Sequence, residues 1–275
     1  KNRYALAWLD IETPSSQTRY WRTVPESGTL QQFREDQQRR SKTRMNVARV
    51  FIRSGPKSHG PGAHDFPQFL KDWVPMLNER GAKASGKDGF PTKGELENTD
   101  VLILHAQEAG NIAVGEERKN LLEFLKRGGG LVVIHAGIVS RDPDWFKSIT
   151  GGSWNHKTPT KWLEAPMSLY FTDHQNPITQ GISNFDIDDE IYYDMDILPE
   201  VKVLAAAYTP KAIDTGGKGN KEAQQRAAEA VAKRKAVNIY DIQPQMWTYE
   251  RTAEGGSTPY RAFVCIPGHY YANFS

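Results

Sequence analysis

Apolar and amphipathic segments alternate through the first half of the 275-residue chain, and this alternation limits the fold more than any other feature. The short apolar runs with the composition of buried strands lie at residues 48–53, 100–105 and 131–135. Between them, apolar side chains recur at helical spacing in residues 66–80 and 116–127, and a glycine follows each stretch. Strands and helices in this order predict a parallel sheet flanked by helices, an α/β layered fold.

Beyond Gly152 the pattern changes to short segments rich in β-branched and aromatic residues. The segments predicted to be strands are residues 163–171, 189–193, 201–208, 246–249 and 261–266. We therefore expect the C-terminal half of the domain to be rich in β-structure.

Two polar segments stand apart from this pattern. Residues 1–46 are interpreted as an N-terminal extension that precedes a single domain at residues 47–275. Residues 211–236 are interpreted as an exposed insertion, because the alanines and the valine of residues 221–235 form too thin an apolar stripe for a core helix. We expect the N-terminal arm to contact a second copy of the chain in a homo-oligomer.

Charge and composition argue against several partners. With 35 Lys and Arg against 33 Asp and Glu, the net charge of +2 is too balanced for the basic stripe that nucleic-acid binding requires. No apolar run approaches the roughly 18 residues of a membrane span. The glycine-rich loop at residues 58–66 lacks both nucleotide-binding spacings, so no nucleotide cofactor is expected. The chain begins at Lys1 rather than methionine, so we expect a periplasmic or secreted protein. The single cysteine, Cys265, rules out an internal disulfide and leaves the cytoplasm open as the compartment.

His135 ends an apolar strand and is followed by Ala136 and Gly137. Ligands of open parallel sheets bind beyond the carboxyl ends of the strands, so a polar residue at this position indicates a functional site. Covalent catalysis is disfavoured, because no G-x-S-x-G motif occurs and Cys265 lies inside an apolar strand. The kinds of chemistry left for a site at His135 are metal-assisted and acid–base catalysis.

Most of the seven histidines stand beside glycine or at predicted strand ends. Zinc binds histidine nitrogens together with a carboxylate, and Glu190, at the start of a predicted strand, is the best carboxylate available. No local spacing such as H-E-x-x-H supports a metal, so buried hydrogen bonds remain the alternative for each histidine. Aromatic residues crowd the same regions, where they could stack on sugar rings or simply fill the core.

Several segments, taken together and in order, resemble the ThuA-like (trehalose utilisation) family over about residues 48–275. They are residues 58–64, 129–136, 151–156, 172–179, 189–192, 244–247 and 267–270. The resemblance implies a three-layer, flavodoxin-like fold similar to class I glutamine amidotransferases. Those enzymes would carry a nucleophilic cysteine at the corner that holds His135-Ala136-Gly137, so no amidotransferase activity is expected. The chain departs from the family at residues 1–46, at the insertion, and in the missing C-terminal helix.

The family resemblance also implies a carbohydrate-processing enzyme that acts on 3-keto-glycosides or 3-keto-disaccharides. A ketone at carbon 3 acidifies the hydrogen on carbon 2, so that a base and a positive group or metal could eliminate or hydrolyse the glycosidic bond. We hypothesise a divalent metal, zinc or similar, held by His135, His156, His269 and Glu190. Catalysis is assigned to His135, Glu190 and His156, and both ligand and acid–base roles stay open. The expected sugar contacts are His59, His64, Trp154, Tyr192 and Trp247. The alternative is a non-catalytic carbohydrate-binding or scaffold protein.

Overall fold

A computed structural model describes residues 47–112, 115–156, 160–210 and 240–274, together with residues 222, 225, 226 and 229. The predicted N-terminal extension, with the oligomer contact expected of it, lies outside the described residues, as does nearly all of the insertion predicted at 211–236.

A nine-stranded sheet forms the centre of the molecule, in the order β2-β1-β3-β4-β11-β10-β9-β6-β7. Its first five strands run parallel to their neighbours. They are β2 (Lys83–Asp88), β1 (Arg49–Ser54), β3 (Val101–Leu104), β4 (Gly130–Ile134) and β11 (Pro259–Cys265). The predicted parallel sheet is thereby confirmed. The strand that the sequence did not reveal is β2, a largely polar edge strand without apolar periodicity.

The C-terminal half of the chain supplies the antiparallel part of the sheet. Its strands are β10 (Tyr240–Thr252), β9 (Lys202–Pro210), β6 (Lys161–Phe171) and β7 (Phe185–Tyr193). A separate two-stranded pair joins β5 (Gly152–Ser153) to β8 (Asp196–Ile197). The expected β-rich C-terminal half is present.

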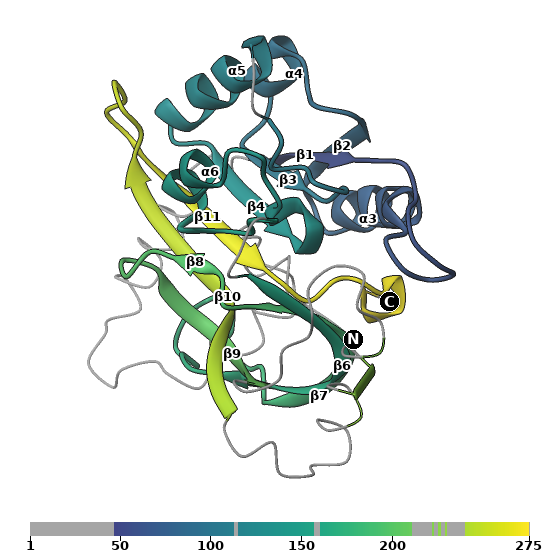
Figure 1. The fold of residues 1–275 in the computed structure, drawn as a ribbon. Helices are drawn as coiled ribbons and strands as arrows, with labels where there is room; N and C mark the ends of the chain where they lie inside the picture. Colours follow the sequence, from purple (N-terminus) through teal and green to yellow (C-terminus); the bar gives the residue numbers. More distant parts are fainter. Residues whose placement is uncertain are drawn as a thin grey trace, which may run out of the picture.

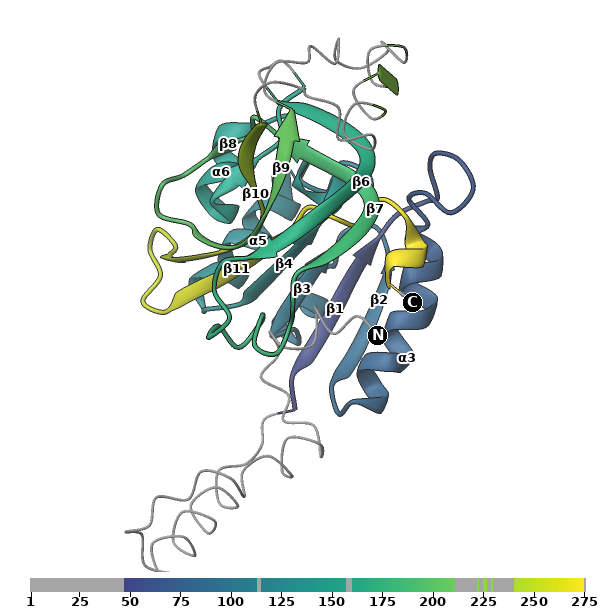
Figure 2. The same cartoon turned by 90° about the horizontal axis from the view of Figure 1, so that it is seen from below.

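Helices cover the two faces of the sheet and give the three expected layers (Figures 1 and 2). On one face, α3 (Phe66–Glu79) packs its apolar stripe into one core cluster, and the short η4 (Tyr271–Phe274) lies beside it. On the other face, α5 (Gly115–Lys126) and α6 (Pro143–Thr150) contribute to a second core cluster, to which α4 (Lys93–Glu97) adds Leu96. The shorter helices α4 and α6 were not evident from sequence periodicity.

Strands β6 and β7 show how the sheet creates a site. On β6, every second residue from Leu163 to Phe171 is buried in the core, and the intervening ones face outward. The outward face of β7 begins exposed at Asp186 and Asp188 but is buried at Glu190 and Tyr192, because other segments cover it there. This covered end of β7 lies at the carboxyl edge of the parallel strands.

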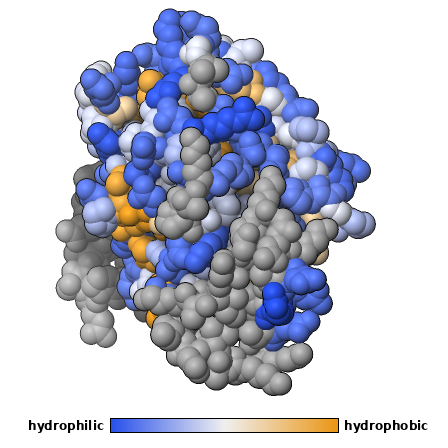
Figure 3. All heavy atoms as spheres, viewed as in Figure 1, coloured by the Kyte–Doolittle hydropathy of each residue, from blue (hydrophilic) through white to orange (hydrophobic). Residues whose placement is uncertain are grey.

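The rest of the described surface is ordinary for a globular domain. Figure 3 shows mostly hydrophilic described residues on the viewed face. The exposed large apolar side chains among the described residues are Val47, Tyr170, Tyr208 and Ile242. No helix within the described ranges is long and apolar enough to cross a membrane.

Candidate metal centre

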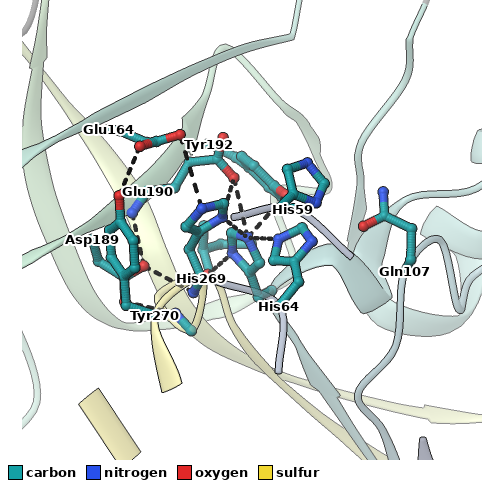
Figure 4. A network of polar contacts seen from close by, with 12 residues as sticks. His59, His64, Gln107, Glu164, Asp189, Glu190, Tyr192, His269 and Tyr270 are labelled. Carbon is teal, nitrogen blue, oxygen red and sulfur yellow. Dashed lines mark hydrogen bonds and ion pairs between the residues drawn. The ribbon is translucent and has the colours of Figure 1, made fainter. Parts of the chain in front are cut away.

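Four buried side chains from separate parts of the fold meet at the carboxyl edge of the sheet (Figure 4). His64 comes from the loop between β1 and α3, and His135 opens the single-turn helix η3 (His135–Ile138) directly after β4. Glu190 lies on β7, and His269 follows β11. The ligand atoms that the four residues offer all lie within 4.8 Å of one another.

The backbone places two of these histidines in an uncommon conformation. His64 has φ 44° and His135 has φ 49°, in the left-handed region that non-glycine residues seldom adopt. Such residues cost on the order of 1–3 kcal/mol each and persist where the surroundings hold them. The backbone N–H of His64 donates to the carbonyl of His269 at 2.8 Å, and a Cβ at Gly137 would lie only 2.6 Å from the Leu104 carbonyl. The turn after β4 therefore requires a glycine two residues beyond His135.

The hydrogen bond of His135 to the main chain determines which ring nitrogen carries its proton. Its Nδ1 lies 2.8 Å from the carbonyl oxygen of Ile266. A carbonyl only accepts, so Nδ1 carries a proton and, in the neutral ring, Nε2 presents a lone pair. The atoms that crowd around this Nε2 are His64 Nε2 at 3.0 Å, Glu190 Oε2 at 3.1 Å, Tyr192 Oη at 3.3 Å and His269 Nδ1 at 3.3 Å. One nitrogen cannot satisfy all of them by hydrogen bonding.

The outward-facing atoms of the other two histidines also have polar neighbours. His64 Nδ1 lies 3.1 Å from Ser58 Oγ, within hydrogen-bonding distance, whereas His269 Nε2 lies 3.8 Å from Glu164 Oε1, too far for a hydrogen bond. Metal-bound histidines in proteins usually have a hydrogen-bonding partner behind them, which the Ile266 carbonyl supplies for His135 and Ser58 for His64. Three imidazoles and one carboxylate, each with an outer partner or an ionised neighbour, match the nitrogen and oxygen ligands that zinc and similar divalent ions prefer. The residues present therefore fit a divalent cation.

Burial and neighbouring charges set the protonation of the cluster. Burial, reinforced by His135 and His269, lowers the pKa of His64 to about 2, so its ring is neutral. For Glu190, burial alone would raise the pKa, but the interactions of its carboxylate with the His135 and His269 imidazoles outweigh burial and hold the pKa below its usual range. For His269, the hydrogen bond and charge of Glu190 outweigh burial and raise the pKa. The centre thus combines an ionised carboxylate at Glu190 with a neutral imidazole at His64.

Asp189 supports the cluster from the opposite face of β7. Its carboxylate is fully buried and accepts the backbone N–H groups of Gly268 at 2.9 Å and His269 at 2.8 Å. It also accepts the side-chain amide of Asn273 at 2.8 Å and the N–H of Glu190 at 2.7 Å. Burial raises its pKa, although these hydrogen bonds oppose that effect. Asp189 therefore holds the loop that carries His269, which includes Gly268 at φ 146°.

An aromatic wall continues outward from the cluster. The ring of Tyr192 stacks on that of His135 at 4.9 Å, and the indole of Trp154 lies 4.5 Å from Tyr192. His59 is exposed, with its ring 4.1 Å from that of His64. These three predicted sugar contacts lie next to the cluster, with His59 at its open side and Tyr192 and Trp154 buried.

The structure groups the predicted ligands differently from the sequence analysis. His64, expected to contact sugar, lies in the cluster, whereas His156, expected as a ligand, lies outside it. His156 Nε2 is 3.2 Å from Glu108 Oε1, and Trp154 Nε1 donates to His156 Nδ1 at 3.5 Å. We refer to His156 and Glu108 as the rim pair. A second difference concerns Trp247, which is 0% exposed and donates to the Thr150 carbonyl at 2.8 Å, so its ring has no face open to a sugar.

Sequence reasoning missed several residues that surround the centre. They are Ser58, Glu108, Glu164, Asp189 and Tyr270. The adjacent carboxylates at positions 188–190 were a signal for Asp189, because neighbouring strand residues point to opposite faces. Glu164 became visible only through the pairing of β6 with β7.

Fold and site together define an α/β protein with a buried histidine–glutamate centre at the carboxyl edge of its sheet. A family model for ThuA, described as trehalose utilisation, matches residues 75–275, and the chain belongs to this family. A ThuA-like protein from Bacteroides uniformis has a similar structure, with 18% identity, a TM-score of 0.54, and coverage of 83% of this chain and 84% of that one.

More distant structural matches are a cytoplasmic protein from Salmonella typhimurium and a glutamine amidotransferase from Thermotoga maritima. The first has 11% identity and a TM-score of 0.47, with 82% of this chain and 90% of that one covered. The second has 8% identity and a TM-score of 0.39, with 80% and 75% covered. No curated protein matches the chain closely enough to count as a relative.

Proposed function

We propose that this chain is a carbohydrate-processing enzyme that acts on 3-keto-glycosides with the help of a divalent cation, zinc or similar. The observation that supports the proposal most is the crowding of electron-pair donors around His135 Nε2, whose Nδ1 is committed to a carbonyl. His64, His135, His269 and Glu190 would hold the cation. A bound cation would polarise the ketone and stabilise the negative charge that develops on its oxygen. Membership of a trehalose-utilisation family supports a carbohydrate substrate.

The proposed reaction begins with the hydrogen on carbon 2, which the neighbouring ketone acidifies. A base takes this proton, and the electron pair of the C–H bond forms the carbon–carbon double bond of an enediolate while the carbonyl π pair moves to oxygen. The enediolate oxygen then restores the C3=O double bond, and the pair of the C2=C3 bond forms a C1=C2 double bond as the C1–O bond breaks. The electron pair of the C1–O bond leaves with the glycosidic oxygen, which takes a proton. Water adds afterwards to complete the net hydrolysis. The sealed cluster favours ligand roles for His135 and Glu190, so proton transfer falls to groups nearer solvent.

The side chains around the cluster suit a neutral, hydroxyl-bearing ligand. Figure 4 shows His59 and Gln107 on the same side of the cluster, and His59 is exposed. The Ser58 hydroxyl donates to Gln107 Oε1 at 3.3 Å. The rim pair adds an imidazole and a carboxylate that are 41% and 26% exposed. Groups that both donate and accept hydrogen bonds are what sugar hydroxyls require.

The test combines metal analysis with turnover. Protein purified without added metal is analysed for bound ions, and its action on a methyl 3-keto-glucopyranoside is followed by NMR. We expect His135→Ala to lose the metal and at least about a hundredfold of the turnover, as removal of a ligand should. His174→Ala is the matched control, since His174 is an exposed histidine outside the cluster, with its Nδ1 3.2 Å from the Ile182 carbonyl. A metal-loaded wild type that binds the keto-glycoside without consuming it would instead favour a non-catalytic carbohydrate-binding protein.

A further inference from the structure

Glu164 on β6 stands directly opposite Glu190 on β7. Residues paired in this way share a face of the sheet, and two like charges there destabilise it. The two carboxylates differ in access: the Glu164 side chain is 43% exposed, and that of Glu190 is 9% exposed. One carboxylate is therefore sealed inside the cluster while its neighbour on the same face is open to solvent.

One carboxylate oxygen of Glu164 accepts a hydrogen bond, and the other does not. Tyr270 Oη donates to Oε2 at 2.8 Å, whereas Oε1 lies 3.8 Å from His269 Nε2, beyond hydrogen-bonding distance. Figure 4 shows Glu164 and Tyr270 together beside His269. The tyrosine thus fixes the direction of the carboxylate, and Oε1 remains free to accept a proton next to the cluster.

The other carboxylates near the centre are committed elsewhere. Asp189 faces the opposite side of β7, where four N–H groups use its oxygens. Glu190 belongs to the cluster itself. Glu108 is held by His156 on one oxygen and by Asn111 Nδ2 at 2.8 Å on the other. Glu164 thus differs from these three carboxylates, because its side chain is exposed and its Oε1 accepts no hydrogen bond from a described residue.

We propose that Glu164 is a catalytic base of this site, and that its Oε1 takes the proton from the carbon next to the substrate ketone. This inference rests on the proposed function and assigns the proton transfer that the function requires. The proton moves to Glu164, the C–H electron pair becomes the double bond of the enediolate, and the ketone oxygen takes the displaced π pair. Return of a solvent-derived proton from Glu164 to the same carbon leaves the substrate unchanged apart from isotope. The substrate class is a ring ketone with an acidic neighbouring C–H.

The experiment measures this step separately from bond cleavage. Wild type and Glu164→Gln are incubated with a methyl 3-keto-glucopyranoside in D2O, and deuterium at carbon 2 of the remaining substrate and of the product is followed by NMR. The affinity of each protein for zinc is measured in parallel. The rate of C–H cleavage is the sum of deuterium exchange into the substrate and formation of product. We expect Glu164→Gln to lower this rate at least about a hundredfold, the usual contribution of a general base, with zinc affinity unchanged within about threefold.

Two further variants sharpen the result. Tyr270→Phe removes the hydrogen bond to Oε2 and should slow C–H cleavage about tenfold, because the carboxylate loses the contact that fixes its direction. Glu250→Gln is the matched control, because Glu250 is an exposed glutamate paired with Arg261 on β11, toward the opposite end from His269. It should cleave the C–H bond at the wild-type rate.

Each contrary outcome overturns a different statement. Wild-type C–H cleavage in Glu164→Gln overturns the role of Glu164 and leaves the proposed function intact. The role of Glu164 as a base is also overturned if Glu164→Gln binds zinc at least about tenfold more weakly and saturating zinc restores C–H cleavage. Glu164 would then be a positioning residue that acts through His269. A zinc-loaded wild type that neither exchanges nor consumes the keto-glycoside overturns both the proposed function and the base.

Discussion

The histidine–glutamate cluster and the rim pair are built from the same residue types but satisfy their polar atoms differently. In the rim pair, the Trp154 N–H donates to Nδ1 of His156, which leaves Nε2–H to donate to Glu108, so donors match acceptors. In the cluster, the Nδ1 proton of His135 is already used, and several electron-pair donors surround its Nε2. The difference teaches that a pair with matched donors and acceptors needs no further partner, whereas the excess of buried acceptors in the cluster is suited to holding a cation.

The largest difference between the two regions is expected in zinc affinity when the carboxylate of each region is replaced. Glu190→Gln takes the only ionised ligand from the cluster group and should weaken zinc binding at least about a hundredfold, measured by competition with a coloured chelator. Glu108→Gln changes the same functional group in the rim pair and should leave zinc affinity within about threefold. Equal losses in the two variants would contradict the distinction between the regions.

A smaller effect is expected behind the cluster, at Asp189. Asp189→Asn places an amide –NH2 among four N–H donors, so at least one buried donor loses its acceptor. We expect the free energy of unfolding to fall by about 2–3 kcal/mol in urea titrations. Zinc affinity should fall about tenfold, because the loop that carries His269 loses its anchor. The control is Asp188→Asn, one residue away on the exposed face, which should change neither quantity appreciably.

The regular part of the fold followed from local sequence pattern, because buried strands and amphipathic helices carry it in their own residues. Leu131 to Ile134 shows this well: a short apolar run became a central strand and brought His135 to the edge where ligands bind. The polar edge strand β2 carries no such pattern, since its side chains are exposed or half-buried and its backbone pairs with β1.

The composition of the cluster could be anticipated only in part. His135 and His269 stand out because each follows a strand at a turn or beside a glycine, and Glu190 stands out as a carboxylate within a predicted strand. His64 and His156 look alike in sequence, each in a polar loop, and only the left-handed turn at His64 and its bond to the His269 carbonyl bring it inward. Glu164 depends on the register between β6 and β7, which local pattern does not encode.

His105 offers a comparison with a buried histidine that lies outside the cluster. Its ring packs against Phe69 at 4.3 Å and Phe66 at 5.0 Å, and burial, with a smaller effect of His135, lowers its pKa to about 3. The folded protein keeps this ring neutral, while the unfolded chain protonates it near pH 6.5. Below that pH the unfolded state binds one more proton, so folding stability is lost as the pH falls toward 3, at about 1.4 kcal/mol per pH unit.

His105→Leu should remove that part of the acid sensitivity. We expect the free energy of unfolding of the variant to depend less steeply on pH between about 6 and 4, with the difference in slope near 1.4 kcal/mol per unit. Urea titrations in the presence of a chelator at several pH values measure it, so that metal binding does not contribute. His64 titrates in the same direction and is present in both proteins, so its contribution cancels. Parallel slopes would mean that the folded state accommodates a charged ring at position 105.

A small expected change in zinc binding decides between the ligand set predicted from the sequence, which includes His156, and the cluster, which does not. His156→Gln keeps an N–H that can reach Glu108 but removes the imidazole that the sequence analysis placed on the metal. Because His156 lies outside the cluster, zinc affinity should change by less than about threefold, while the KM for a methyl 3-keto-glucopyranoside should rise several-fold through one lost polar contact. Zinc titration and steady-state kinetics on the same preparation separate the two quantities. A loss of zinc as large as that of Glu190→Gln would return His156 to the ligand set and require the loop at residues 155–156 to close on the cluster when the ion binds.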